Sequence, residues 1–169
     1  MKIERKWAMP NRWTFTIKPI RELLKEEVVG GLWCDPFAGQ NSPASVRNDI
    51  QQGTKAEFHL DALTFLKTLG SVAYDGVLYD PPYSITQARM YGKKEFSSMK
   101  YWADCKKEVA RILRPGGKAI CFGWTSMGIG KGCGFEMTRV LLVPHGGSKN
   151  DTIVTVELKL TPTHPLQIT

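Results

Sequence analysis

Short apolar runs alternate with amphipathic helical segments along most of this chain, and that alternation limits the folds open to it. Apolar side chains recur at helical spacing over residues 16–30, 61–70 and 98–113. Strand-like apolar runs cover residues 32–37, 44–50, 55–61, 74–80 and 118–124. Strands that alternate with helices predict an α/β fold with a mostly parallel sheet.

The C-terminal part of the chain is β-rich. Residues 136–145 and 151–160 are apolar runs joined by the turn-forming sequence Gly-Gly-Ser-Lys-Asn, which predicts an antiparallel hairpin. We expect this hairpin to place one antiparallel strand at the edge of the sheet. With 169 residues, 42% of them apolar, the chain can bury one core. We therefore expect a single domain over residues 1–169, with residues 161–169 as a loose tail.

The sequence carries no signal for a membrane or for export. No apolar run is long enough to span a bilayer, and the N-terminus lacks the apolar stretch of a secretory signal. The four cysteines form no Cys-x-x-Cys pair, which favours reduced thiols. These features indicate a cytoplasmic protein with no membrane partner. The three histidines share no metal-ligand spacing, so we expect no metal.

Positive charge is concentrated in one part of the chain. Nine basic and three acidic residues lie between Ser84 and Lys118, so this stretch carries six of the seven net positive charges. A segment of this kind is either the solvated face of a helix or a binding surface for a polyanion such as nucleic acid. The candidate nucleic-acid contacts are Arg89, Lys93, Lys94, Lys106, Lys107 and Arg111.

Two segments leave predicted strand ends with unusual chemistry. Residues 35–41 read Asp-Pro-Phe-Ala-Gly-Gln-Asn, and residues 80–83 read Asp-Pro-Pro-Tyr. A glycine after a strand lets backbone approach a ligand closely, and Asn41 tolerates a left-handed conformation. Consecutive prolines cannot continue a strand, because neither has an N–H group to donate. Ligands bind beyond the carboxyl ends of parallel strands, so both segments are expected to contribute to one site.

Residues 80–83 suit a reaction at an amino group. The lone pair of the exocyclic amino nitrogen of adenine is delocalised into the ring, which makes that nitrogen a poor nucleophile. Two acceptors for its N–H groups would draw the nitrogen toward tetrahedral geometry and free the lone pair. The Asp80 carboxylate and the Pro81 carbonyl can be these acceptors, held in place by the proline rings. Tyr83 offers a flat face on which the base can stack.

The same residues carry a resemblance to a known family. Asp80-Pro81-Pro82-Tyr83 resembles the catalytic tetrapeptide of the S-adenosylmethionine-dependent DNA amino-methyltransferases, the adenine-N6 and cytosine-N4 enzymes. Residues 35–39 resemble their cofactor loop, and residues 15–24 resemble a lysine-proline helix beside the methionine end of the cofactor. Residues 113–124 are similar to the turn and strand that follow the helix after the catalytic loop. In detail, the chain is most similar to small methylases of bacteriophages and prophages.

This resemblance implies a Rossmann-like class I methyltransferase sheet, with S-adenosylmethionine as the methyl donor and Asp80, Pro81, Pro82 and Tyr83 as catalytic residues. The residues expected to bind the cofactor are Phe15, Thr16, Lys18, Asp35, Pro36, Phe37, Gly39, Asn41, Asp49, Asp61 and Ala62. Among them, the Asp49 carboxylate suits two ribose hydroxyls. Asp61 suits an exocyclic amine and is also a good helix N-cap.

The chain departs from the family pattern in two ways. The cofactor loop continues Gly39-Gln40-Asn41 instead of glycine-x-glycine, and only a few residues separate it from the strand at 44–50. A parallel crossover needs a dozen or more residues, so we expect the first crossover helix to be reduced. No segment is long enough for a separate target-recognition domain. Contact with DNA is therefore expected from the basic stretch, from a homodimer or from a separate specificity partner.

The resemblance leaves several substrates open. Asp80 in the first position favours adenine N6, because the cytosine-N4 enzymes more often have serine there. Methyltransferases that act on RNA or on protein amides more often begin the tetrapeptide with asparagine. A nucleic-acid-binding module of the same fold without activity is the remaining alternative, and the intact tetrapeptide disfavours it. We expect duplex DNA as the substrate, with the target base flipped out, in a bacterial or phage-infected cell.

Overall fold

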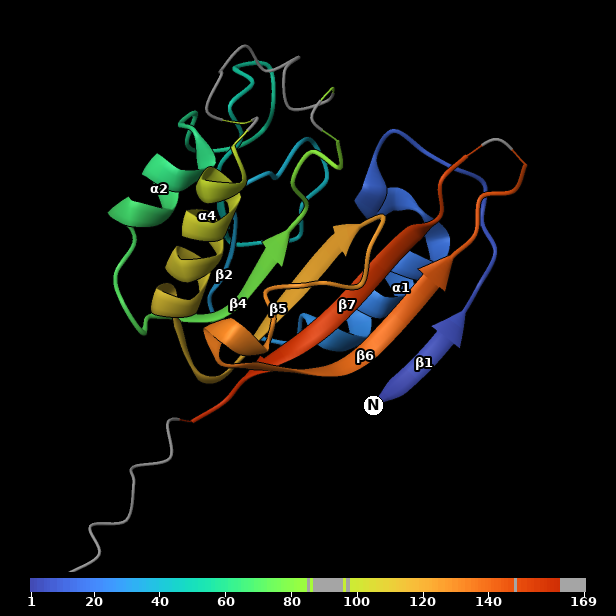
Figure 1. The fold of residues 1–169 in the computed structure, drawn as a ribbon. Coiled ribbons are helices and arrows are strands. Elements are labelled where there is room, and N and C mark those ends of the chain that lie inside the picture. Colours follow the sequence, from blue (N-terminus) through green and yellow to red (C-terminus); the bar gives the residue numbers. More distant parts are fainter. Residues whose placement is uncertain (85, 87–95, 97, 148, 162–169) are drawn as a thin grey trace, which may run out of the picture.

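The computed structural model describes residues 1–84, 86, 96, 98–147 and 149–161. Within these residues one seven-stranded sheet has the order β1-β6-β7-β5-β4-β2-β3 (Figure 1). Its strands are β1 (Lys2–Arg5), β2 (Trp33–Asp35), β3 (Val46–Arg47), β4 (Tyr74–Tyr79), β5 (Leu113–Gly123), β6 (Phe135–Val143) and β7 (Thr152–Lys159). The helices are η1 (Thr14–Thr16), α1 (Lys18–Glu27), α2 (Ala62–Thr68), α4 (Met99–Ile112) and η3 (Lys131–Cys133).

The sheet is mostly parallel, as the sequence predicted. β7 runs antiparallel to both of its neighbours, β5 and β6, and the other neighbouring pairs are parallel. The predicted C-terminal hairpin is therefore confirmed as the β6–β7 pair. The expectation that an antiparallel strand forms the edge of the sheet is wrong, because β7 lies inside the sheet and β1 occupies that edge beside β6.

The edge strand β1 is held by ion pairs more than by apolar packing. Its sequence, Lys-Ile-Glu-Arg, contains one apolar residue, which is why no strand was predicted there. Arg139 of β6 is only 7% exposed, and its guanidinium lies 2.6 Å from the Glu4 carboxylate of β1. The same guanidinium lies 2.7 Å from Glu26 and 2.9 Å from Glu27, both of α1. The hydrogen bond from Arg139 to Glu4 is the largest cause of the lowered pKa of Glu4.

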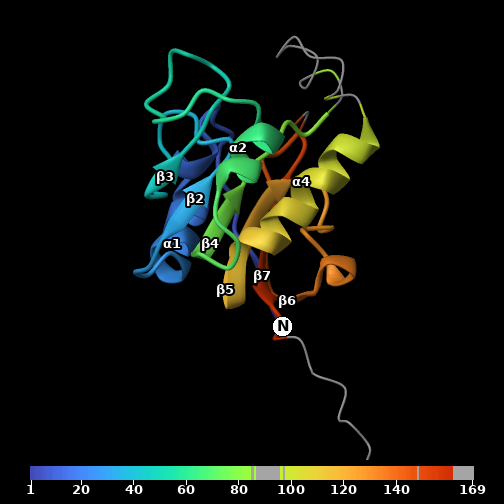
Figure 2. The same ribbon diagram turned by 90° about the vertical axis from the view of Figure 1, so that its left-hand side faces the viewer.

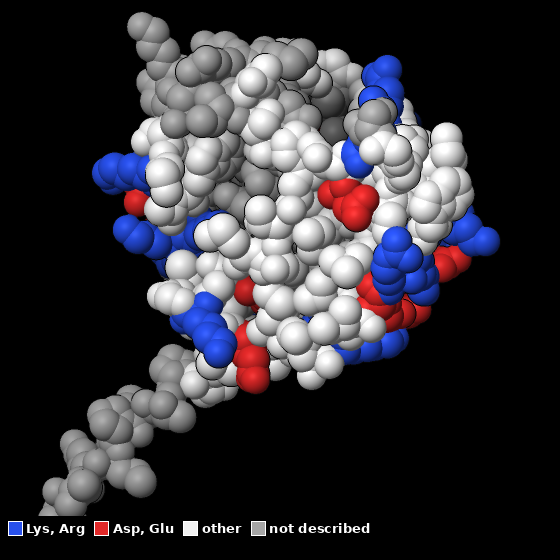
Figure 3. Space-filling view, turned by 45° about the vertical axis from the view of Figure 1, so that its right-hand side comes forward, with Lys and Arg blue, Asp and Glu red and all other residues white. Residues whose placement is uncertain are grey.

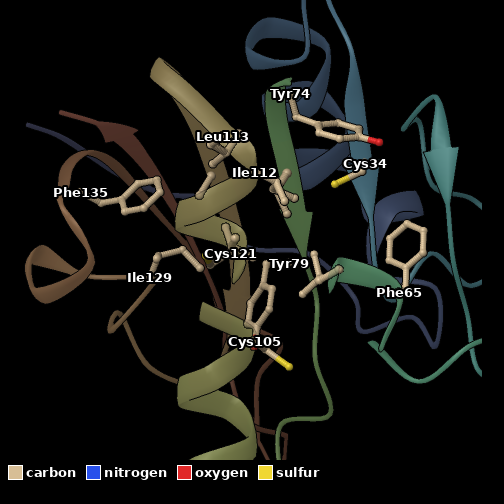
Figure 4. Packing of buried hydrophobic residues seen from close by; sticks show 14 of the residues in the cluster. Cys34, Phe65, Tyr74, Tyr79, Cys105, Ile112, Leu113, Cys121, Ile129 and Phe135 are labelled. Atoms are coloured by element: carbon tan, nitrogen blue, oxygen red, sulfur yellow. The ribbon is translucent and has the colours of Figure 1, made fainter. Parts of the chain in front are cut away.

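Helices cover the two faces of the sheet. Figures 1 and 2 show α1 on one face and α2 and α4 on the other. The α1 core includes Ile20, Leu23, Leu78 and Ile120, all buried. The buried residues of the opposite face, several of which are shown in Figure 4, include Phe65, Cys105, Ile112 and Cys121. Neighbouring residues of β4 and β5 thus alternate between two cores, as in a sheet buried on both faces.

The region between β2 and α2 is less regular than predicted. Residues 36–45 form turns and no helix, which confirms the expected reduction of the first crossover helix. Residues 55–61 do not form the predicted strand. Only an isolated parallel bridge links Phe58 to Asn48, because β3 spans two residues and offers little edge to pair with. The predicted helices at 16–30, 61–70 and 98–113 are confirmed as α1, α2 and α4.

Candidate active site

A cavity of about 560 Å³ lies at the carboxyl ends of β2 and β4. Its walls come from several parts of the chain that are separated in sequence. They are residues 11–15, 36–41, 49–51 and 80–83, together with Ala62, Phe96, Tyr101 and Trp102. The two loops that the sequence singled out therefore share one cavity, as parallel strand ends require.

The cavity brings together most of the predicted site residues. All four residues of the 80–83 loop line it, as do Phe15, Pro36, Phe37, Gly39, Asn41, Asp49 and Ala62. Thr16, Lys18, Asp35 and Asp61 do not line it. Gly39 has a φ of +53°, as a close backbone approach favours. Asn41 is not left-handed, because Val72 is the only non-glycine residue with positive φ in the described part of the chain.

Asp35 shapes the first loop from inside the protein. Its side chain is fully buried, Oδ1 accepts a hydrogen bond from the Phe37 N–H at 2.8 Å, and Oδ2 accepts one from the Ser42 hydroxyl at 2.6 Å. Burial raises the pKa of Asp35 to about 8, against the effect of both hydrogen bonds. At neutral pH this acid is therefore mostly protonated.

Asn48 joins the first loop to the segment before α2, and sequence reasoning missed it. The side chain is fully buried; its amide nitrogen donates to the Pro36 carbonyl at 3.1 Å and to the Leu60 carbonyl at 3.0 Å. Its amide oxygen accepts from the Leu60 N–H at 2.9 Å. The signal in the sequence was an asparagine directly after a short strand, since a buried amide there needs several partners.

Asp49 presents a carboxylate at the cavity wall. Its Oδ2 accepts from the Gly39 N–H at 2.9 Å, and its Oδ1 accepts from the Gln51 N–H at 2.8 Å. Each carboxylate oxygen can accept a second hydrogen bond, so this half-buried group can also bind two hydroxyls of a ligand. The Gly39 contact fixes the carboxylate at the start of the 39–41 turn.

The 80–83 loop pairs a carboxylate with a hydroxyl. Asp80 Oδ1 accepts a hydrogen bond from the Tyr83 hydroxyl at 2.5 Å. Burial raises the pKa of Asp80 to about 6, although the hydrogen bond from Tyr83 lowers it. Burial also raises the pKa of Tyr83, so its hydroxyl keeps its proton and remains a donor. The Tyr83 ring meets the edge of Trp124 at a centroid distance of 5.7 Å.

Asp61 lies at the start of α2, where it is the predicted N-cap. Its Oδ1 accepts from the Thr64 N–H at 3.1 Å, and its Oδ2 accepts from the Thr64 hydroxyl at 2.6 Å. The Tyr101 hydroxyl donates to the same carboxylate at 3.3 Å. Asp61 therefore orients Tyr101, which lines the cavity beside Ala62.

The predicted nucleic-acid contacts divide into two groups. Arg89, Lys93 and Lys94 lie outside the described residues, and Lys106, Lys107 and Arg111 lie on α4. Lys107 forms an ion pair with Asp104 at 3.4 Å. Arg111 pairs with Glu108 at 2.7 Å and donates to the Leu66 carbonyl at 2.9 Å, which ties α4 to α2. Figure 3 shows described acidic and basic side chains interspersed on the face that it presents.

The described residues contain neither a membrane-spanning helix nor a metal-binding cluster. No helix there is long and apolar enough to cross a bilayer. No cluster of three histidine, cysteine, aspartate or glutamate side chains there has the arrangement of a metal site. The four cysteines are all free thiols, as expected, and three of them are buried.

Comparisons with known proteins define the class of fold. No family model matches the sequence, and no curated protein matches it. The structure resembles TrmN from Thermus thermophilus, with a TM-score of 0.59 and 18% identity over 85% of this chain and 49% of that one. This chain thus spans about half the length of TrmN.

Two other structures resemble the chain over more of their own length. The 1,6-didemethyltoxoflavin-N1-methyltransferase from Burkholderia thailandensis, solved with S-adenosylhomocysteine, has a TM-score of 0.58 and 13% identity, covering 83% of this chain and 76% of that one. A SAM-dependent methyltransferase from Methanosarcina mazei has a TM-score of 0.56 and 14% identity, covering 82% and 97%. The chain has the Rossmann-like fold of class I methyltransferases.

Proposed function

We propose that this chain is an S-adenosylmethionine-dependent methyltransferase that acts on an exocyclic amino group in DNA, at adenine N6. The observation that carries the proposal is the position of Asp80. Its carboxylate lines the same cavity as Gly39 of the first loop and as Asp49. The first loop and the 80–83 loop lie at the carboxyl ends of β2 and β4, which are neighbouring parallel strands. Structures with this fold include SAM-dependent methyltransferases, which supports the choice of cofactor.

The residues around the cavity fit S-adenosylmethionine in volume and in chemistry. A volume of about 560 Å³ is within the usual range for small-molecule sites. Asp49 can hold the two ribose hydroxyls, and Phe37 and Ile50 add partly buried apolar surface beside it. When bound there, S-adenosylmethionine would supply a methyl group activated by a positively charged sulfur.

Asp80 and Pro81 provide the acceptors that an amino group needs in order to attack. With a pKa of about 6, Asp80 is ionised at neutral pH and can accept an N–H hydrogen bond. We assign the second acceptor to the Pro81 carbonyl, on the rigid loop before Pro82. The amino nitrogen loses a proton as it gains the methyl group, and Asp80 is the carboxylate positioned to take that proton. Tyr83 supplies the aromatic face for the flipped base.

The aspartate at position 80 supports adenine N6 over cytosine N4, the alternative. DNA is proposed as the partner because of the basic stretch, in which Lys106 and Lys107 belong to α4 and Arg89, Lys93 and Lys94 precede it. We propose that a homodimer or a separate partner contributes the sequence specificity. The proposed setting is the cytoplasm of a bacterial or phage-infected cell.

A labelled-methyl assay tests this function at the level of substrate class. The protein is incubated with S-adenosylmethionine carrying a labelled methyl group and, in separate reactions, with duplex DNA, single-stranded DNA, RNA or a protein extract. The proposal predicts label in DNA. Label in RNA or protein alone would reject DNA as the substrate. Cofactor binding in calorimetry without transfer to any of the four would reject the enzyme activity.

A further inference from the structure

The N-terminal segment, residues 6–13, runs from the carboxyl end of β1 to the cavity. Figure 1 shows it as the dark blue trace that passes the β6–β7 hairpin and enters η1. The Lys6 N–H donates to the Leu142 carbonyl at 3.0 Å, and the Ala8 N–H donates to the Pro144 carbonyl at 3.2 Å. The hairpin therefore holds the first half of the segment in place.

The second half of the segment forms part of the cavity wall. Asn11, Arg12 and Trp13 all line the cavity. The Trp13 N–H donates to the Asn11 side chain at 3.0 Å, and the Trp13 carbonyl accepts from the Thr16 N–H at 2.9 Å and from the Thr16 hydroxyl at 2.8 Å. The Trp13 ring lies 4.0 Å from the position that a Cβ atom at Gly39 would take, which places the ring next to the first loop. Trp13 is thus a fixed aromatic surface at the wall.

The Arg12 side chain rests on the Trp13 ring. The central carbon of its guanidinium lies 4.3 Å from the ring centroid, a cation–π contact. Arg12 is exposed, and it forms no ion pair with any residue that the structure describes, whereas Arg111 on α4 pairs with Glu108 at 2.7 Å. A planar guanidinium held by its face keeps its N–H groups available along its edge, in the geometry that binds a phosphate.

We propose that Arg12 binds a backbone phosphate of the nucleic acid, beside the target nucleotide at the mouth of the cavity. This role rests on the proposed function, because it requires a base that enters the cavity while its strand stays outside. A flipped nucleotide remains joined to its neighbours, so its flanking phosphodiesters lie at the mouth. Of the described residues that line the cavity, Arg12 alone is basic, and it can offset the repulsion of a phosphate by Asp49 and Asp80.

Fluorescence anisotropy of fluorescein-labelled oligonucleotides measures this contact without methyl transfer. Arg12→Ala should weaken binding about tenfold, by a similar factor for oligonucleotides of unrelated sequence. With duplex DNA, the slope of the logarithm of affinity against the logarithm of salt concentration should become less negative by about 0.9. Arg12→Lys should keep the slope and regain part of the affinity, since lysine keeps the charge without the planar donors. The control is Lys67→Ala, which removes an exposed charge of α2 that does not line the cavity and should change neither quantity.

Separate measurements identify the anion that Arg12 binds. Calorimetry should show the same affinity for S-adenosylmethionine in the wild type and in Arg12→Ala. Weaker cofactor binding with an unchanged salt slope would overturn the proposal and assign Arg12 to the cofactor carboxylate. Equal effects of Arg12→Ala and Lys67→Ala would overturn it too, as would a wild type that binds neither duplex DNA, single-stranded DNA nor RNA. The expected Arg12 dependence without any methyl transfer in the labelled assay would support the phosphate contact and reject the proposed enzyme activity.

Discussion

The two loops of this protein that begin with Asp-Pro, residues 35–41 and 80–83, differ in the hydrogen-bond donors that their backbones offer to the aspartate. Asp35 is the last residue of β2 and Asp80 directly follows β4, and each is succeeded by a proline. Asp35 accepts a hydrogen bond from the N–H of Phe37, two residues later, and is fully buried. At Asp80 the residue two positions later is Pro82, which has no N–H. The backbone of the second loop therefore cannot satisfy the Asp80 carboxylate as that of the first satisfies Asp35.

This difference supports a structural role for Asp35 and the proposed catalytic role for Asp80. Asp35, with a pKa of about 8, is mostly protonated at pH 7, whereas Asp80, with a pKa of about 6, is mostly ionised. Two acids whose environments move their pKa values apart can take different roles in one site. Because Pro82 offers no N–H group, the Asp80 carboxylate accepts from the Tyr83 hydroxyl and keeps acceptor capacity for the proposed substrate.

The largest expected effect is on turnover in Asp80→Ala. The variant removes an acceptor that acts mainly while the amino group attacks, so kcat should fall by on the order of a hundredfold or more. The affinity for S-adenosylmethionine, measured by calorimetry, should stay close to that of the wild type. Steady-state kinetics with Asp35→Asn provide the matched comparison, since that change should cost far less turnover. Equal losses in the two variants would remove the distinction between the loops.

Asp49→Ala should weaken cofactor binding rather than slow the chemical step. The variant removes the carboxylate assigned to the ribose hydroxyls and the acceptor of the Gly39 N–H. Calorimetry should show affinity for S-adenosylmethionine weakened about tenfold or more, as expected for hydrogen bonds to a charged group. Saturating cofactor should then restore most of kcat. Unaltered affinity would mean that Asp49 only shapes the loop.

Pro82→Ala gives the 80–83 loop the backbone donor that distinguishes the 35–41 loop. An alanine at this position restores an N–H two residues after Asp80, the donor that Phe37 supplies to Asp35. We expect this new hydrogen bond to lower kcat by about tenfold or less, through competition with the amino group for the carboxylate. The pH–rate profile checks the cause, because the acidic limb should move to lower pH. An acidic limb that does not move would show that Pro82 serves only to stiffen the loop.

At Asp35 we expect a pH-dependent change in stability rather than a large change in turnover. A folded-state pKa of about 8, against about 3.9 in an unfolded chain, means that the folded state binds more protons between these values. Asp35 therefore lowers stability progressively as pH rises from about 4 to about 8. Asp35→Asn removes this dependence, so the Tm of the variant relative to that of the wild type should be higher at pH 8 than at pH 5. Differential scanning calorimetry at pH 5 and pH 8 measures it.

The sequence allowed much of this fold to be predicted because its central elements have clear periodicity. The apolar runs of β2, β4 and β5 and the amphipathic face of α4 were sufficient to predict a parallel sheet, its helices and the edge where ligands bind. Asp61 was predicted as an N-cap from its position alone, and its hydrogen bond to Thr64 confirms it.

The parts that were missed depend on contacts between distant residues. β1 is held by Arg139, which is 135 residues away from Glu4, and no local pattern indicates that pairing. Asn48 acquires its role only when separate loops meet. The two Asp-Pro motifs begin alike in the sequence. Their carboxylates differ because Asp35 accepts from the Phe37 N–H and the Ser42 hydroxyl, whereas Pro82 gives Asp80 no backbone donor two residues later.

If Asp80 directs methyl transfer to the amino group of adenine, as we propose, the identity of the methylated atom is the decisive observation. Duplex DNA is treated with S-adenosylmethionine and either the wild type or Asp80→Ala, digested to nucleosides and analysed by mass spectrometry. We expect N6-methyl-2′-deoxyadenosine with the wild type and at least about a hundredfold less with the variant. Equal amounts with both proteins, or methylation at a ring carbon instead of an amino group, would contradict it.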